Sequence, residues 1–129
     1  MNGCTWLVDG NNVFGSRPDG WWNDPQAAKR RLAQRVAEWS RSHDDPVVLV
    51  FDPPVAPDTL GLAGGNLTIE VAAGRGRDAA DDQIVELARD MDAPRVVTSD
   101  RGLRRRLVEQ STGTVQIIGV SRFRELIGY

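Results

Sequence analysis

The feature that most constrains this chain is a regular alternation of short apolar runs with segments of helical periodicity. A continuous β-branched and apolar run is typical of a strand buried on both faces, as a parallel sheet requires. Strands that alternate with helices are joined by right-handed crossovers, which place helices on both faces of the sheet. We therefore expect an α/β fold, a three-layer α/β/α sandwich around a central, mainly parallel five-stranded sheet. The predicted strands cover 4–8, 47–51, 67–72, 95–98 and 114–118.

The helices are predicted from capping residues and apolar spacing. Asn23-Asp24-Pro25 combines an N-cap residue type with proline in the first helical turn. The stretch 53–65 is rich in proline and glycine, so we expect a loop there. The predicted helices cover 25–42, 78–91, 100–110 and a short last segment capped by Ser121.

Length and composition indicate one soluble globular domain over residues 1–129, with an ordinary 40% of hydrophobic residues. Cys4 is the only cysteine and His43 the only histidine, which excludes an internal disulfide and a zinc site built from cysteines or several histidines. The first residues lack the basic and apolar regions of a signal peptide, and no apolar run is long enough to span a membrane. The expected compartment is the cytoplasm.

The formal net charge of −2 argues only weakly against a nucleic-acid partner. If metal ions covered several aspartates, the remaining surface would be basic. Lys29 is the only lysine, so arginine supplies nearly all of the positive charge. Four arginines crowd into one predicted helix: Arg101, Arg104, Arg105 and Arg106. Such a cluster is either a solvated helix face or a phosphate-binding surface.

Acidic residues follow four of the predicted strands. In parallel sheets the ligand site lies beyond the carboxyl ends of the strands, so these residues are expected to meet at one edge. Asp78 and Asp81 are three apart in the predicted helix and would share one face. The acidic set consists of Asp9, Asp52, Asp78, Asp81, Asp82 and Asp100, with Ser99 beside the last.

Each acid alone has a purely structural explanation as an N-cap, a helix-dipole partner or a turn residue. Their convergence favours a site, because two carboxylates about 4 Å apart repel by about 4 kcal/mol at an effective dielectric of about 20. All-oxygen ligands without histidine suit Mg²⁺ or Mn²⁺. Such ions activate water and stabilise the leaving oxygen of a phosphodiester.

At these residues the chain resembles the NYN domain of the PIN-like nuclease superfamily, in particular its YacP-like bacterial branch. The resemblance implies a PIN-like sheet and a metal-dependent endoribonuclease acting on RNA, single-stranded RNA being the expected form. A protein partner would then supply target specificity. The matching segments are Val8-Asp9-Gly10-Asn11-Asn12-Val13, Val50-Phe51-Asp52, Asp78-Ala79-Ala80-Asp81-Asp82 and Val97-Thr98-Ser99-Asp100.

The resemblance also assigns roles to individual residues. Asp9, Asp81 and Asp100 match the core metal carboxylates of the family, and Asp52 and Asp78 match its more variable acids. We accordingly expect Asp9, Asp52, Asp81 and Asp100 to be catalytic and Asp78 to be a further metal ligand. Asn12, Ser99 and Asp82 are expected to support the site. The chain departs from the YacP pattern at Asn11, where tyrosine is usual, and at the Ala-Ala pair before Asp81, where that branch tends to have threonine.

Local explanations compete with several of these roles. Asn12 could form an Asx turn instead of holding a carboxylate, and Ser99 could cap the helix that begins near Asp100. Trp21 and Trp22 could stack on bases, or pin the first helix to the sheet. The expected RNA contacts are Arg101, Arg104, Arg105, Trp21 and Arg77.

Other function classes fit less well. Residues 74–79 superficially match a dinucleotide-binding fingerprint, but not at the first strand-to-helix turn. A phospho-receiver site would need a lysine at the fifth strand, and Lys29 is elsewhere. The alternative to a nuclease is a non-catalytic RNA-binding or partner-docking module on the same fold.

Overall fold

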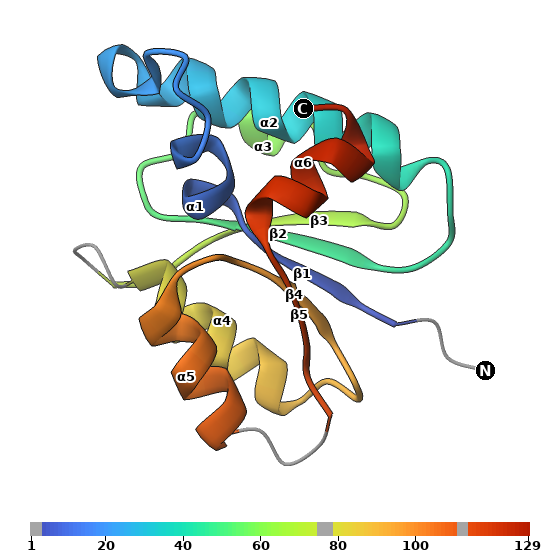
Figure 1. Cartoon of the computed structure of the whole chain (residues 1–129). Helices are drawn as coiled ribbons and strands as arrows, with labels where there is room; N and C mark the ends of the chain where they lie inside the picture. Colours follow the sequence, from blue (N-terminus) through green and yellow to red (C-terminus); the bar gives the residue numbers. More distant parts are fainter. Residues whose placement is uncertain (1–3, 75–78, 111–113) are drawn as a thin grey trace.

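The computed structural model describes residues 4–74, 79–110 and 114–129. Within these residues the chain forms a five-stranded sheet of order β3-β2-β1-β4-β5 in which all neighbouring strands are parallel (Figure 1). The strands are β1 (Trp6–Asp9), β2 (Val47–Phe51), β3 (Leu67–Val71), β4 (Arg95–Val97) and β5 (Gln116–Ile118). All five lie within about two residues of the predicted apolar runs, so the expected parallel sheet is confirmed.

Helices cover both faces of the sheet, which confirms the three-layer sandwich (Figure 1). One face carries α1 (Gly10–Gly15), the short 3-10 helix η1 (Trp21–Asn23), α2 (Pro25–Ser40), α3 (Pro57–Leu60) and α6 (Val120–Ile127). The other face carries α4 (Ala79–Arg89) and α5 (Arg101–Gln110). The side chain of Asp24 accepts from the backbone N–H of Ala27 and caps α2, as the Asn23-Asp24-Pro25 pattern predicts.

Two apolar cores hold the layers together. Successive strand residues point to opposite faces, so Val8 packs under α1, α2 and α6 while Leu7 packs under α4 and α5. Both side chains are fully buried, and complete burial of such a residue contributes about 1.5–3 kcal/mol to folding. The two cores meet through the central strands β1, β2 and β4, which therefore have fixed relative positions at their carboxyl ends.

The structure differs from the sequence-based expectation in three places. Helix α1 follows β1 without a loop, and α3 occupies part of the predicted loop. Helix α6 begins at Val120 after Gly119, so the prediction that Ser121 caps it is wrong. Instead the hydroxyl oxygen of Ser99, far away in sequence, accepts the N–H of Val120 at 2.9 Å. Short helices and caps supplied by distant residues have no periodic signal in the sequence.

None of the described helices combines the length and apolar character needed to cross a membrane.

Candidate active site

Asp9 is the last residue of β1 and the most buried of the predicted acids that the structure describes, with only 3% of its surface exposed. One carboxylate oxygen accepts from the hydroxyl of Thr98 at 3.0 Å. The other lies 3.5 Å from the N–H of Asn12, at the start of α1. Strand β1 thus delivers a carboxylate to the carboxyl edge of the sheet, and the neighbouring strand β4 holds it in one orientation.

The pKa of Asp9 is raised to about 7. Burial is the largest cause, and the negative charges of Asp81 and Asp100 add to it, while the hydrogen bonds from Thr98 and Asn12 oppose it. Among the described residues, the carboxylate of Asp9 makes no ion pair with a lysine, arginine or histidine. Two further acids therefore act on a buried carboxylate whose charge is not neutralised by a basic side chain in this part of the chain.

Asn12 connects α1 to the end of β4. Its side-chain oxygen accepts the backbone N–H of Ser99 at 2.7 Å. The amide is thus used across the site and not in a local Asx turn. Because Asn12 also donates its backbone N–H toward Asp9, a single residue aligns the ends of two strands.

Asp100 begins α5. Its side-chain oxygen accepts the N–H of Leu103 at 2.9 Å, the geometry of an N-cap. The suggestion that Ser99 caps this helix is therefore wrong, because Asp100 does so while Ser99 binds the start of α6. The N–H of Asp100 donates to the hydroxyl of Thr98 at 3.1 Å, so Thr98 bridges Asp9 and Asp100.

The acids of α4 have different positions. Asp81 lies in the first turn of α4 and raises the pKa of Asp9 through its charge. Asp82 forms an ion pair of 2.9 Å with Arg106 on α5 and is largely exposed. Asp78 and Arg77 lie outside the described residues. Asp81 is thus the acid of this helix that acts on Asp9 within the described chain.

Asp52 directly follows β2 and has different surroundings. Its backbone N–H donates to the side-chain oxygen of Asn11 at 2.8 Å, and one carboxylate oxygen accepts the N–H of Ala80 at 2.8 Å. The ammonium of Lys29, in α2, donates to the carbonyl oxygens of Asp52 and Pro54 at 2.8 and 2.7 Å. Burial lowers the pKa of Lys29, and the charge of Asp52 opposes that change.

Sequence reasoning did not assign a role to Thr98, Asn11 or Lys29. One signal for Lys29 was available, because it shares helical spacing with the buried Leu32, Ala33 and Val36. A charged residue in the middle of an apolar stripe must find polar partners inside the fold. Thr98 and Asn11 have no comparable signal, since their partners lie on other elements.

The donor set can be compared with the needs of a metal ion. Among the described residues, no group of three or more aspartate, glutamate, histidine or cysteine side chains is arranged to hold one. Mg²⁺ usually keeps several waters and binds through one or two carboxylates plus substrate oxygens, so a closed protein cage is not required. The buried Asp9 with Asp81 and Asp100 nearby fits a hard cation of this kind by its oxygen chemistry and charge.

The arginines of α5 divide into two groups. Arg101, Arg104 and Arg105 are exposed and line a groove of about 360 Å³ together with Val108, Glu109 and Ile117. Arg106 is instead paired with Asp82. The groove begins one residue after Asp100 and so continues from the acidic edge along α5.

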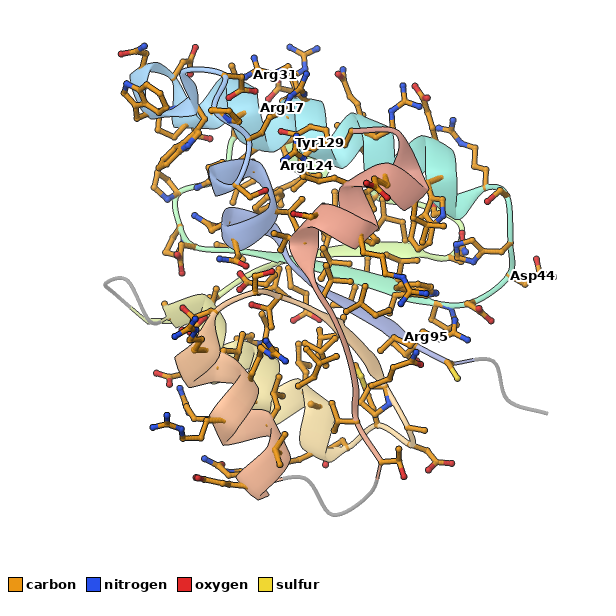
Figure 2. All side chains as sticks on the ribbon, viewed as in Figure 1. Arg17, Arg31, Asp44, Arg95, Arg124 and Tyr129 are labelled. Atoms are coloured by element: carbon orange, nitrogen blue, oxygen red, sulfur yellow. The ribbon has the colours of Figure 1, made fainter. Side chains whose placement is uncertain are left out.

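The other aromatic and basic side chains lie elsewhere. Trp21 is half-buried and packs edge to face on Phe14 with ring centroids 5.5 Å apart, as expected of a residue that pins this layer, whereas Trp22 is 60% exposed. Figure 2 shows Arg17 and Arg31 together over α2, on the far side of the sheet from α5. Both face the carboxylate of Asp19, at 3.6 and 3.7 Å.

Comparisons with known proteins agree with this architecture. A family model described as a PIN like domain matches residues 62–120. The solved structure of Rae1 (YacP) from Bacillus subtilis is similar with a TM-score of 0.73 and 22% identity, over 98% of this chain and 74% of that chain. A mutant of the same protein gives a TM-score of 0.71 and 23% identity, over 95% and 73%. No curated protein sequence matches significantly.

The matched region contains Asp81 and Asp100 but not Asp9 or Asp52. At this level of identity the structural likeness establishes the fold. The chain therefore has a PIN-like α/β/α fold, and the predicted resemblance to YacP-like proteins of the PIN-like superfamily is confirmed at the level of the fold.

Proposed function

We propose that this chain is a metal-dependent endoribonuclease that hydrolyses RNA phosphodiester bonds with Mg²⁺ or Mn²⁺. The observation that carries the proposal is the buried carboxylate of Asp9, on which the charges of Asp81 and Asp100 both act. Convergent carboxylates repel one another unless a cation or shared protons compensate them. The PIN-like fold and the family match over residues 62–120 support a nuclease.

In this proposal Asp9, Asp81 and Asp100 hold the metal, and Asp78 is a further candidate ligand. When bound, the ion would lower the pKa of an attacking water and stabilise the leaving oxygen of the phosphodiester. The chain's own contribution is orientation. Thr98 and Asn12 fix the carboxylate of Asp9, and the N-cap bond to Leu103 fixes that of Asp100.

The groove formed by Arg101, Arg104 and Arg105 is the proposed binding surface for the RNA backbone. Guanidinium groups bind phosphate oxygens in a bidentate manner, and within the described part of the chain none of these three forms an ion pair with an acid. Arg17 and Arg31, by contrast, share Asp19. The exposed ring of Trp22, more than the half-buried Trp21, offers a surface for stacking on bases. A protein partner that selects the RNA completes the proposal.

The test is cleavage of single-stranded RNA by the purified protein in Mn²⁺ or Mg²⁺, with EDTA as the control. Asp9→Asn and Asp100→Asn should each lower the cleavage rate by at least about a hundredfold, the scale expected when a group that stabilises transition-state charge is lost. Asp90→Asn, which changes an exposed acid just beyond the other end of α4, should cleave like the original chain.

Two outcomes would contradict the proposal. Cleavage that persists in EDTA would show that the reaction does not need a metal ion. Full activity in Asp100→Asn would show that this carboxylate is not required for cleavage. RNA that binds but is never cut in Mn²⁺ would instead favour the alternative of a non-catalytic RNA-binding module.

A further inference from the structure

We propose that Asp52 is a positioning residue and not a metal ligand, and that Asn11 and Lys29 act through it. Together these three side chains would set the first turn of α4 and so hold Asp81 near Asp9. The inference rests on the proposed function for its catalytic consequence, but its geometry is independent of any bound metal.

Asp52 is held at three of its polar groups. Asn11 accepts its backbone N–H at 2.8 Å, and Lys29 donates to its carbonyl oxygen at 2.8 Å. One carboxylate oxygen then accepts the N–H of Ala80 at 2.8 Å. The first four N–H groups of a helix have no partner within the helix. For α4, the carboxylate of Asp52, which lies outside this helix, accepts one of these N–H groups. One carboxylate oxygen of Asp52 is therefore already engaged in a hydrogen bond within the protein.

The contact between Asn11 and Asp52 depends on a close approach of α1 to β2. A Cβ atom at Gly10 would lie 2.5 Å from the ring of Phe51 and 2.8 Å from the carbonyl oxygen of Val50. Only a residue without a side chain can therefore start α1 against the end of β2. This approach brings Asn11 to the backbone of Asp52.

Lys29, in α2, holds the same segment through its backbone carbonyl groups. Only 3% of its surface is exposed, and its ammonium also binds the carbonyl oxygen of Pro54 at 2.7 Å. A buried ammonium with two carbonyl partners is a rigid anchor, because releasing either bond leaves polar groups unsatisfied. The path from α2 through Asp52 to α4 is thus made of short, directed hydrogen bonds.

Asp81 directly follows Ala80, the residue that Asp52 binds. The direction of its side chain is set by the first turn of α4. A displacement of about 1 Å at a catalytic group can lower a rate about a hundredfold, so a residue that fixes this turn controls catalysis without touching the substrate.

The test compares two substitutions of Asp52 by two readouts, the hydrogen-exchange rate of the Ala80 amide and the affinity for Mn²⁺. Asparagine caps helices as well as aspartate does, so Asp52→Asn should keep a slow Ala80 amide and bind Mn²⁺ within about threefold of the original chain. Asp52→Ala removes the acceptor. Its Ala80 amide should exchange about five- to tenfold faster, the effect of losing an N-cap, and its Mn²⁺ affinity should fall.

Asp81→Asn is the matched comparison for direct ligation, since it should weaken Mn²⁺ binding while leaving the Ala80 amide slow. Asn11→Leu should resemble Asp52→Ala, and Asn11→Asp, which keeps an acceptor, should restore the slow Ala80 amide. If Asp52→Asn lost Mn²⁺ affinity as fully as Asp81→Asn, Asp52 would be a ligand and the inference would be overturned.

An Ala80 amide that is unchanged in Asp52→Ala would overturn it as well. Failure of the proposed function is a separate result. In that case the original chain would not bind Mn²⁺ or cut RNA, while the Ala80 amide would still respond to Asp52→Ala.

Discussion

Two carboxylates lie at the carboxyl ends of neighbouring strands, at the same edge of the sheet, and their surroundings are opposite. Asp52 directly follows β2, and its carbonyl oxygen accepts from the ammonium of Lys29 while its carboxylate accepts from the start of α4. Asp9 ends β1 and is more deeply buried, and the charges of Asp81 and Asp100 act on it. The positive charge of Lys29 and the N–H of Ala80 compensate Asp52. Among the described residues, only neutral hydrogen-bond donors reach Asp9.

Both residues are aspartates, so it is the compensation of charge around them that distinguishes a structural acid from a candidate metal ligand. A carboxylate whose charge is compensated inside the fold stabilises the metal-free protein. A buried, ionised carboxylate near other acids lowers the free energy of unfolding unless it binds a cation or a proton. The comparison predicts opposite responses to substitution and to metal at the two positions.

The largest effect on stability is expected at Asp9. Its pKa is about 7 in the folded protein and 3.8 in the unfolded chain. Between these values the folded protein holds a proton that the unfolded chain has released, so the free energy of unfolding falls as pH rises through this window. Such a shift corresponds to roughly 4 kcal/mol. In EDTA at a pH above this window, Asp9→Asn should therefore be more stable than the original chain by about that order.

Denaturant unfolding of both proteins in EDTA across this pH range measures the effect. The stability of Asp9→Asn should change much less with pH, since the titrating group is gone. A mutant that is destabilised throughout the range would show that the charge of Asp9 is compensated after all.

A substitution on the other side of the comparison should have the opposite sign. Lys29→Met keeps the apolar stem but leaves the carbonyl oxygens of Asp52 and Pro54 without their donor. The free energy of unfolding should fall by roughly 2 kcal/mol, because buried acceptors lose their partner. Thermal melts should show this loss in EDTA and a loss at least as large in Mn²⁺, because the same anchor holds Asp81 near Asp9 and so supports the stabilisation by metal. The neighbouring exposed Arg30, which pairs with Asp58, is the control, and Arg30→Met should cost at most about 1 kcal/mol.

Asp81 tests whether the acids share one site. If its charge acts on Asp9, Asp81→Asn should be more stable than the original chain in EDTA by about 1 kcal/mol. It should also lose most of the stabilisation by metal, which is about 2.7 kcal/mol when the metal is a hundredfold above its dissociation constant. If Asp81 only favours the helix N-terminus, the mutant should be less stable by about 0.3–1 kcal/mol in both conditions.

The smallest effect concerns the groove along α5. Replacing Arg104 and Arg105 with alanine should weaken RNA binding at every sequence and reduce the slope of log affinity against log salt by about 1.4, for two lost phosphate contacts on a single strand. Arg106→Ala is the control, because Arg106 is paired with Asp82. An unchanged slope in the double mutant would make the groove an ordinary solvated surface.

The strands and the longer helices were predictable because each has a local signal. The apolar runs predicted all five strands, and Asp24 before Pro25 predicted the start of α2. Elements without such a signal were missed: α1 has six residues and α3 four, too short for a clear period. The cap of α6 was also misassigned, because its acceptor belongs to Ser99 at the end of another strand.

The chain by itself determined that acids would gather at one edge of a parallel sheet. Strand periodicity and right-handed crossovers suffice for that, since they bring the carboxyl ends of all strands together. Only the tertiary structure decided which of these acids is compensated. Lys29 brings a positive charge to Asp52, whereas Asp9 receives only the neutral hydroxyl of Thr98, and both partners are far from these acids in the chain. Electrostatic interactions depend on distance in space and on burial, and neither can be read from sequence spacing before the helices are packed.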